Sequence, residues 1–231
     1  MHVAARQRIL ATLPDDALVL DVGGWAVPFP RADWMLDLGS YATRGTWGYE
    51  GDREAERFTE ARWVQRDICD REPWPFADDQ FDFAICSHTL EDVRDPVWVC
   101  AELARVARAG YIEVPSRLEE QTWALQGAWT GWSHHHWLID VDQAAARIDF
   151  LFKSHAVHAQ PNRFPAGFRE SLSDVDRIQS LWWEDTFAAR ERILFTAEEL
   201  DGDLSGFVAA HAPPPAPPRA RWRAAISRLT R

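Results

Sequence analysis

Lysine is almost missing from this 231-residue chain, and several other features are scarce as well. Lys153 is the only lysine, and no apolar run reaches the roughly 18 residues of a membrane-spanning helix. No basic start is followed by an apolar stretch, so no signal peptide is expected. The three cysteines, Cys69, Cys86 and Cys100, are odd in number and irregularly spaced. This pattern predicts buried, reduced thiols and a cytoplasmic protein rather than a disulfide-stapled one.

The overall charge and composition narrow the class of protein further. A formal net charge of −11 argues against nucleic acid as the main partner, because the phosphate backbone attracts basic surfaces. Hydrophobic residues make up 46% of the chain and aromatic residues 12%, which excludes disorder as a description of the whole chain. Thirteen tryptophans supply rigid surface for a core or for a ligand. We therefore expect one folded domain and no nucleic-acid partner.

Two short apolar runs near the start of the chain end in carboxylates. Residues 18–20 are apolar and lead through Asp21 to Gly23 and Gly24, and residues 34–36 lead to Asp37. An apolar strand stopped by a glycine turn is typical of the first strand of an α/β sheet, where the backbone approaches a ligand closely. An acidic residue closing the second strand is suited to accept hydrogen bonds from a ribose diol. This pattern predicts a nucleoside-cofactor site.

Strand and helix patterns alternate along the first half of the chain. Helices are predicted over residues 3–13 and 96–107, and further strands over residues 63–67, 81–86 and 111–114. Such alternation predicts an α/β fold: a doubly wound, mostly parallel sheet of about seven strands with helices on both faces. The second half is less regular, with a helical pattern over residues 142–152 and either a helix or an ordered excursion expected over residues 171–183. A late strand over residues 192–196 is expected at an antiparallel edge.

The predicted domain organisation has four parts. Residues 1–210 form the domain, within which residues 117–140 are expected to be an acceptor lid or insertion. Residues 211–218 are a proline-rich linker, and residues 219–231 form a basic amphipathic tail with five arginines. Such a tail favours weak peripheral contact with the inner face of a membrane. A solvated tail, or one that folds back on the acidic body, is the alternative.

Three segments of the chain resemble the class I S-adenosylmethionine-dependent methyltransferases. The likeness covers about residues 18–115, with LVLDVGG (18–24) similar to the first-strand motif of that family. WPFADDQFDF (74–83) is similar to its "LPFxDxxFD" segment, and CSHTLEDVRDP (86–96) to its "sxxLEHvxdP" segment. The resemblance implies a Rossmann-like methyltransferase fold with S-adenosylmethionine as cofactor. Two departures are Trp25 and Val27 at usual glycine positions, and Asp92 where histidine is common.

Carried over residue by residue, the resemblance implies seven cofactor contacts. They are Asp21, Gly23, Gly24, Asp37, Asp67, Ile68 and Ser87. Asp21 would orient the loop or the cofactor's ammonium, Asp37 would bind the ribose hydroxyls, and Asp67 the adenine amino group with Ile68 beside the ring. The alternative for each aspartate is a plain structural one, because aspartate also ends strands and caps helices.

Candidate acceptor residues lie near the same strand ends. Methyl transfer from a sulfonium is an in-line displacement, and a base is needed only where the acceptor proton must leave. His88, just after the fourth strand, is the candidate base. Glu113 and Arg117 are expected at the cleft, either binding the acceptor or pairing with each other. His134, His136 and Trp132 are expected to form the roof over a small-molecule or glycan-like acceptor, unless they belong to a satellite hydrophobic cluster.

Alternative functions remain open at this point. A histidine triplet, if extended, places two imidazoles on one face, but no cysteine or acidic residue stands nearby at a ligand spacing, so no metal site is predicted. Trp25 in the glycine loop motivates a methyltransferase-like binding module without catalysis. A nicotinamide-dependent oxidoreductase shares the strand–glycine–aspartate pattern, but the G-x-G-x-x-G loop is missing. We expect a methyl transfer to oxygen or nitrogen.

Overall fold

The computed structural model describes residues 1–45 and 53–212. Nearly all of the predicted linker and the whole basic tail therefore lie outside the described residues. Within the described part, no helix has the length and apolar character needed to cross a membrane.

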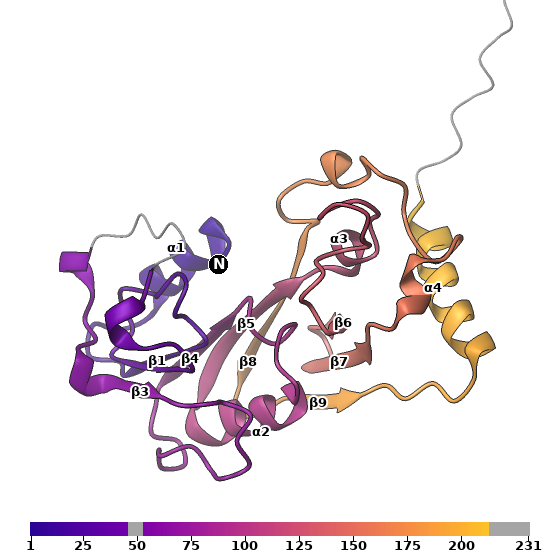
Figure 1. Ribbon diagram of the computed structural model, residues 1–231. Coiled ribbons are helices and arrows are strands. Elements are labelled where there is room, and N and C mark those ends of the chain that lie inside the picture. The colour runs from indigo at the N-terminus through magenta and orange to yellow at the C-terminus, as the bar shows by residue number, and fades with distance from the viewer. Residues whose placement is uncertain (46–52, 213–231) are drawn as a thin grey trace, which may run out of the picture.

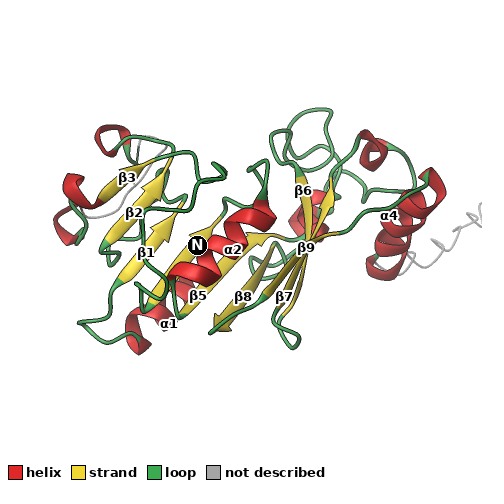
Figure 2. Ribbon diagram, turned by 90° about the horizontal axis from the view of Figure 1, so that it is seen from below, coloured by secondary structure: helices red, strands yellow, loops and turns green. Residues whose placement is uncertain are grey.

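The main sheet has six strands in the order β3-β2-β1-β4-β5-β8, seen in Figure 2. Their bounds are β1 Val19–Val22, β2 Trp34–Asp37, β3 Trp63–Gln65, β4 Phe83–Ser87, β5 Ala109–Pro115 and β8 Ile178–Glu184. The first five pair in parallel, and β8 runs antiparallel to β5. The order reverses between β1 and β4, and ligands of open α/β sheets bind in the crevice at such a switch point. The predicted doubly wound fold is confirmed.

One helix covers each face of this sheet. Helix α1 (Val3–Thr12) buries Ile9 against Met35 and Ile85 on one face. Helix α2 (Pro96–Val106) packs Leu103 on the other face. Its start follows the predicted pattern: the Asp95 side chain accepts a hydrogen bond from the backbone N–H of Trp98, and proline occupies the first turn.

A second, smaller sheet packs on the same face of the main sheet as α2. Its strands are β6 (Trp137–Asp142), β7 (Arg147–Phe152) and β9 (Ala188–Glu191), in the order β6-β7-β9. Phe150 of this sheet belongs to the same buried cluster as Leu103. Figure 1 shows helix α4 (Ala197–His211) beyond this sheet, at the end of the molecule away from β1. Short helical turns complete the fold: α3 (Arg117–Glu120) and 3-10 turns Tyr41–Thr43, Arg53–Ala55, Glu60–Arg62, His155–His158 and Arg169–Ser171.

Two predictions for the second half were wrong, and of the two alternatives for residues 171–183 the helix is excluded. Residues 142–152 form a turn and strand β7 instead of a helix, and residues 171–183 form a loop leading into β8. The late strand predicted over residues 192–196 lies outside any strand, and β8 supplies the antiparallel edge. Short apolar runs are compatible with the period of a helix and with that of a strand. Here alternate side chains such as Leu181 and Trp183 are buried, as they are in a strand. The three cysteines are free and buried, as predicted.

Candidate cofactor and acceptor site

Three adjoining cavities meet at His88, at the carboxyl end of β4. The first, of about 300 Å³, lies between the glycine loop and helix α1, and is lined by Asp21, Gly23, Gly24 and Ser87 among others. The second, of about 330 Å³, contains Asp37, Asp67 and Ile68 in its wall. The third, of about 460 Å³, is lined by Glu91, Asp92, Trp132, His134 and His135. All seven predicted cofactor residues therefore line the first two cavities, at the switch point of the sheet.

The glycine loop is shaped by close contacts that a side chain would destroy. Gly23 has a φ of +77°, and a Cβ there would lie 2.2 Å from Oγ1 of Thr89. A Cβ on Gly24 would lie 2.2 Å from Oδ2 of Asp21. Both positions therefore require glycine, for backbone conformation in the first case and for space in both.

Asp21 is a buried carboxylate beside this loop. Its Oδ2 accepts a hydrogen bond of 2.8 Å from the backbone N–H of Phe29. Burial raises the pKa of Asp21 to about 7, and the bond from Phe29 offsets only part of this effect. Asp21 has no ion-pair partner within residues 1–45 and 53–212, and a buried carboxylate of this kind in a cavity wall is poised to bind a cation, as the predicted contact with an ammonium requires.

Asp37 organises the loop as well as lining the second cavity. Its Oδ2 accepts from the backbone N–H of Trp25 at 2.9 Å and its Oδ1 from that of Gly39 at 2.6 Å. Burial raises the pKa of Asp37, against these backbone hydrogen bonds. Each oxygen keeps acceptor capacity, so the carboxylate fits the predicted binding of a ribose diol.

Trp25 does not fill the space expected for the cofactor. Its indole lies against Gly39, where a Cβ would come within 2.4 Å of the ring, and its Nε1 donates to Oγ1 of Thr43 at 3.0 Å. Trp25 thus forms part of the wall of a second cavity that retains about 330 Å³. The bulky residue reshapes the loop without closing the site.

Asp67 and Ile68 follow β3, the outer strand of the sheet. Asp67 is ion-paired with Arg94, and its Oδ1 accepts from the backbone N–H of Cys69 at 2.9 Å. The hydrogen bond from Arg94 lowers the pKa of Asp67 and keeps this carboxylate ionised. Ile68 is buried beside it and offers an apolar surface for a flat ring.

A buried carboxylate, Glu113 of β5, connects the groups at the centre of the site. It accepts hydrogen bonds from the backbone N–H of His2, at 2.9 and 2.8 Å, and from the Tyr111 hydroxyl. Nε2 of His88 lies 3.1 Å from its Oε1, and the Ser87 hydroxyl 3.4 Å from it. Despite its burial, these donors lower the pKa of Glu113 to about 2.

His88 is held as an imidazolium at neutral pH. Burial acts to lower its pKa, but the hydrogen bonds to Glu113 and to Glu91, whose Oε1 lies 3.4 Å from Nδ1, raise the pKa to about 9. Its φ of +53° is in the left-handed region, and the turn it makes points the ring to the junction of the three cavities. The tentative base thus occupies the expected place, but in its protonated form.

The structure brings only some of the predicted acceptor residues together. Trp132 and His134 line the third cavity, but His136 does not. Extended backbone would place His134 and His136 on one face, whereas residues 132–135 form a turn, with the N–H of His135 bonded to the carbonyl of Trp132. The turn brings His135, rather than His136, to the cavity.

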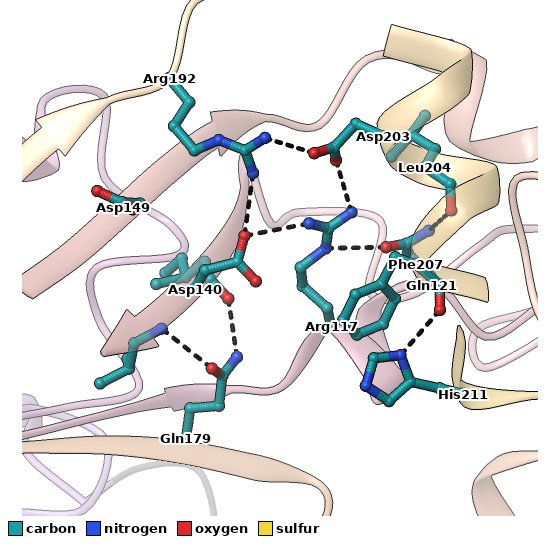
Figure 3. Close-up of polar contacts among 12 residues, drawn as sticks. Arg117, Gln121, Asp140, Asp149, Gln179, Arg192, Asp203, Leu204, Phe207 and His211 are labelled. Carbon is teal, nitrogen blue, oxygen red and sulfur yellow. Dashed lines mark hydrogen bonds and ion pairs between the residues drawn. The ribbon is translucent and has the colours of Figure 1, made fainter. Parts of the chain in front are cut away.

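Arg117 lies away from this site, contrary to prediction. Its guanidinium is buried and binds Asp140 at 3.1 Å and Asp203 at 2.8 Å (Figure 3). It also lies over the ring of Phe207, 4.3 Å from the centroid. Arg117 and Glu113 therefore do not pair, and Arg117 holds helix α4 onto the second sheet. The two residues are close in sequence, but the strand ends between them.

Several lining residues escaped prediction from the sequence. Met1 and Arg6, at the start of the chain and in α1, line the first cavity. No local sequence pattern predicts that this segment lies beside the cavity. Thr89 packs on Gly23 and donates to its carbonyl at 3.3 Å. Asp92 lines both the second and the third cavity. The sequence marked this position, because the family that the chain resembles commonly has histidine there.

Comparisons with known proteins bear on this arrangement. A family model described as "Methyltransferase domain" matches residues 47–112. No curated protein matches the chain. Among solved structures, YcgJ of Bacillus subtilis is 18% identical, with a TM-score of 0.37, over 50% of this chain and 52% of its own.

Two further solved structures are similar over comparable lengths. An S-adenosylmethionine-dependent methyltransferase of Mesorhizobium loti is 18% identical over 52% of this chain and 59% of its own, with a TM-score of 0.36. A Thermotoga maritima protein titled a possible histamine N-methyltransferase is 22% identical over 47% and 48%, with a TM-score of 0.32. The chain thus spans about half the length of these three structures.

The family match covers the segment that carries β3, β4, α2 and most of β5. The loops of this segment, after β3 and after β4, supply part of the wall of the second cavity, including the turn at His88, and the sheet order places the glycine loop beside them. The match shows that the segment from β3 to β5, with the turn at His88, is similar to a methyltransferase domain.

Proposed function

We propose that this protein transfers a methyl group from S-adenosylmethionine to an oxygen or nitrogen of a small-molecule or glycan-like acceptor. The observation that carries the proposal is the meeting of the three cavities at His88. The first two hold carboxylates and an apolar residue suited to an ammonium, a ribose and a ring. The third is lined by Trp132 and by groups that form hydrogen bonds, which suits a polyhydroxylated or aromatic acceptor.

The residues at the junction have defined tasks in this proposal. When bound, the cofactor supplies the activated methyl group, so the protein mainly positions the acceptor and excludes water. Asp21 binds the ammonium of the cofactor's amino-acid part, and Asp37 binds the hydroxyl groups of its ribose. His88, as the neutral imidazole, accepts the acceptor proton, and Glu113 stabilises the imidazolium that forms.

Calorimetric titration with S-adenosylmethionine and S-adenosylhomocysteine tests the first half of the proposal. We expect one molar equivalent of either ligand to bind. No heat at millimolar ligand would overturn the proposal in favour of a methyltransferase-like binding module. NADH titration followed by fluorescence is the counter-test for a nicotinamide site, which is expected to give no binding.

Replacing Asp37 by Ala is expected to weaken cofactor binding by about 1–3 kcal/mol, through lost charge-assisted hydrogen bonds and a loosened loop. Calorimetry measures the change. Asp82→Ala is the matched control, because Asp82 also accepts a backbone N–H, that of Leu18, but at the amino ends of β1 and β4, opposite the cavities. Equal affinity in Asp37→Ala and the wild type would place the ribose acceptor elsewhere.

The methylation rate is expected to rise with pH, to reach half of its maximum near pH 9 and to level off above it, because only neutral His88 accepts a proton and its pKa is raised to about 9. The charged groups that face its imidazole are Glu113, Glu91 and the amino group of Met1, with Asp92 and His134 in the walls of the same cavities. Once an acceptor is identified, the rate profile of His88→Gln should lose this titration. A pH-independent wild-type rate would contradict the role of His88 as a base.

A further inference from the structure

We propose that Asp92, His134 and His135 form a binding site for one divalent transition-metal ion, Zn²⁺ foremost, in the wall of the acceptor cavity. One ligand atom from each of the three lies within 4.8 Å of the others. The two imidazole Nε2 atoms each lie 3.9 Å from Oδ1 of Asp92. No ligand for the two histidines stands near them in the sequence, so only the fold reveals the set.

The separations suit a tetrahedral ion after small side-chain movements. Ligand atoms at about 2.0–2.2 Å from Zn²⁺ lie roughly 3.4 Å apart in a tetrahedron. The present 3.9 Å separations exceed this by about half an ångström. Asp92 and His134 are 41% and 58% exposed, so their side chains are free to rotate by that amount. His135, which is 8% exposed, provides the fixed side of the site.

His135 is oriented as metal-binding histidines usually are. Its Nδ1 lies 2.7 Å from Oε1 of the buried Glu120, which fixes the ring and leaves Nε2 directed at Asp92. Glu120 is in turn held by Lys153, whose Nζ lies 2.6 Å from its Oε2. Carboxylates that accept the second N–H of a ligating histidine set its tautomer and raise its affinity for metal. The only lysine of the chain thus supports this site.

Glu91 gives a second, independent indication that a ligand belongs here. It is 1% exposed and lines the same cavity, and its Oε2 is buried without a hydrogen-bond partner among the residues that the structure describes. A buried carboxylate oxygen without a donor is costly unless something unseen satisfies it. Water bound to a metal ion at the adjacent Asp92 is a donor of the required kind. A metal ion also supplies positive charge beside two neighbouring carboxylates.

Three protein ligands leave a position open toward the acceptor cavity. An ion of this kind binds and polarises an oxygen atom of a hydroxyl or carboxylate group, and lowers the pKa of a bound hydroxyl. On the proposed methyltransferase function, this favours acceptors that bind through oxygen, with the reacting atom held beside His88. The metal site itself does not depend on that function.

Cobalt binding tests the site. The full chain without a histidine tag is treated with chelator, dialysed and titrated with Co²⁺, which gives visible absorption bands in protein sites, and Zn²⁺ is measured by calorimetry. We expect one equivalent of either ion. Asp92→Asn and His135→Ala should each weaken binding at least tenfold, and Glu120→Gln about 10- to 100-fold. His136→Ala is the matched control, because this exposed neighbour is outside the set.

Circular dichroism of each variant shows whether it folds, and His134→Ala serves as the exposed ligand variant least coupled to the core. No binding of Co²⁺ or Zn²⁺ by the wild type, or equal affinity in His134→Ala and His136→Ala, would overturn the metal site. Failure of S-adenosylmethionine to bind would overturn the methyltransferase proposal alone. Metal binding with a methylation rate unchanged by chelator would remove the catalytic role and leave the site.

Discussion

Replacing Glu113 by Gln is expected to lower the free energy of unfolding at pH 7 by about 1–3 kcal/mol, since Glu113 is buried and the change leaves its buried donors partly unsatisfied, while His88 remains accessible to solvent. Glutamine keeps the volume of the side chain. Its amide, however, cannot accept hydrogen bonds from the Tyr111 hydroxyl, the His2 backbone and the His88 imidazolium together. Urea unfolding gives the difference.

The pH dependence of this loss has a defined sign. The pKa of Glu113 is lowered to about 2 from an ordinary 4.5, so its stabilisation is present above pH 4.5 and is lost as the pH falls toward 2. The pKa of His88 is raised to about 9 from 6.5, so its contribution is present below pH 6.5 and is lost as the pH rises through 9. Wild-type stability from this pair is therefore greatest between about pH 4.5 and 6.5.

In Glu113→Gln, the free energy of unfolding is expected to depend less on pH, both below pH 4.5 and above pH 6.5. The pKa of His88, followed by NMR, should fall. Glu184→Gln is the control, because Glu184 is exposed at the end of β8. A variant as stable as the wild type at pH 5.5 would show that Glu113 does not hold these groups together. The same variant should shift the pH–rate profile to lower pH, which separates a lost base partner from general destabilisation.

Asp21→Asn is expected to have opposite effects on stability and on binding. At pH 8 the variant should be more stable than the wild type by about 2–4 kcal/mol, because the wild type buries a charge whose pKa is raised to about 7. The folded protein binds this proton more tightly than the unfolded chain. Stability therefore falls as the pH rises from about 4 to 7, and the two proteins should be alike near pH 4. The asparagine carbonyl still accepts from Phe29.

The affinity of Asp21→Asn for the cofactor should be lower than that of the wild type, by about 1.5–3 kcal/mol, because a charged hydrogen bond is lost. Asp33→Asn is the control: this carboxylate accepts the Val19 N–H and pairs with Arg31 at 3.0 Å, so its removal should destabilise the protein at pH 8. Destabilisation by Asp21→Asn at pH 8 would contradict a buried charge. Unchanged affinity would show that the cofactor's ammonium is bound elsewhere.

The local sequence determined the positions of the residues that we propose to bind the cofactor. Parallel strands that end together bring Asp21, Asp37 and Asp67 to one edge of the sheet, so their place follows from strand order alone. Gly23 and Gly24 follow from the tight turn. Strands β1 to β5 and helices α1 and α2 were predictable because their apolar runs and caps are local signals.

Tertiary structure decided the rest. Residues 142–152 became a strand because pairing with β6 and burial in the second sheet outweighed a helical pattern. Arg117 turned from the cleft to Asp140 and Asp203, which come from β6 and α4, far along the chain. Asp92 meets His134 and His135 only where the turn after β4 lies against the loop before β6. The sequence by itself determined which residues end the strands, whereas contacts between distant segments determined which polar groups share the third cavity, because those contacts have no local period or spacing.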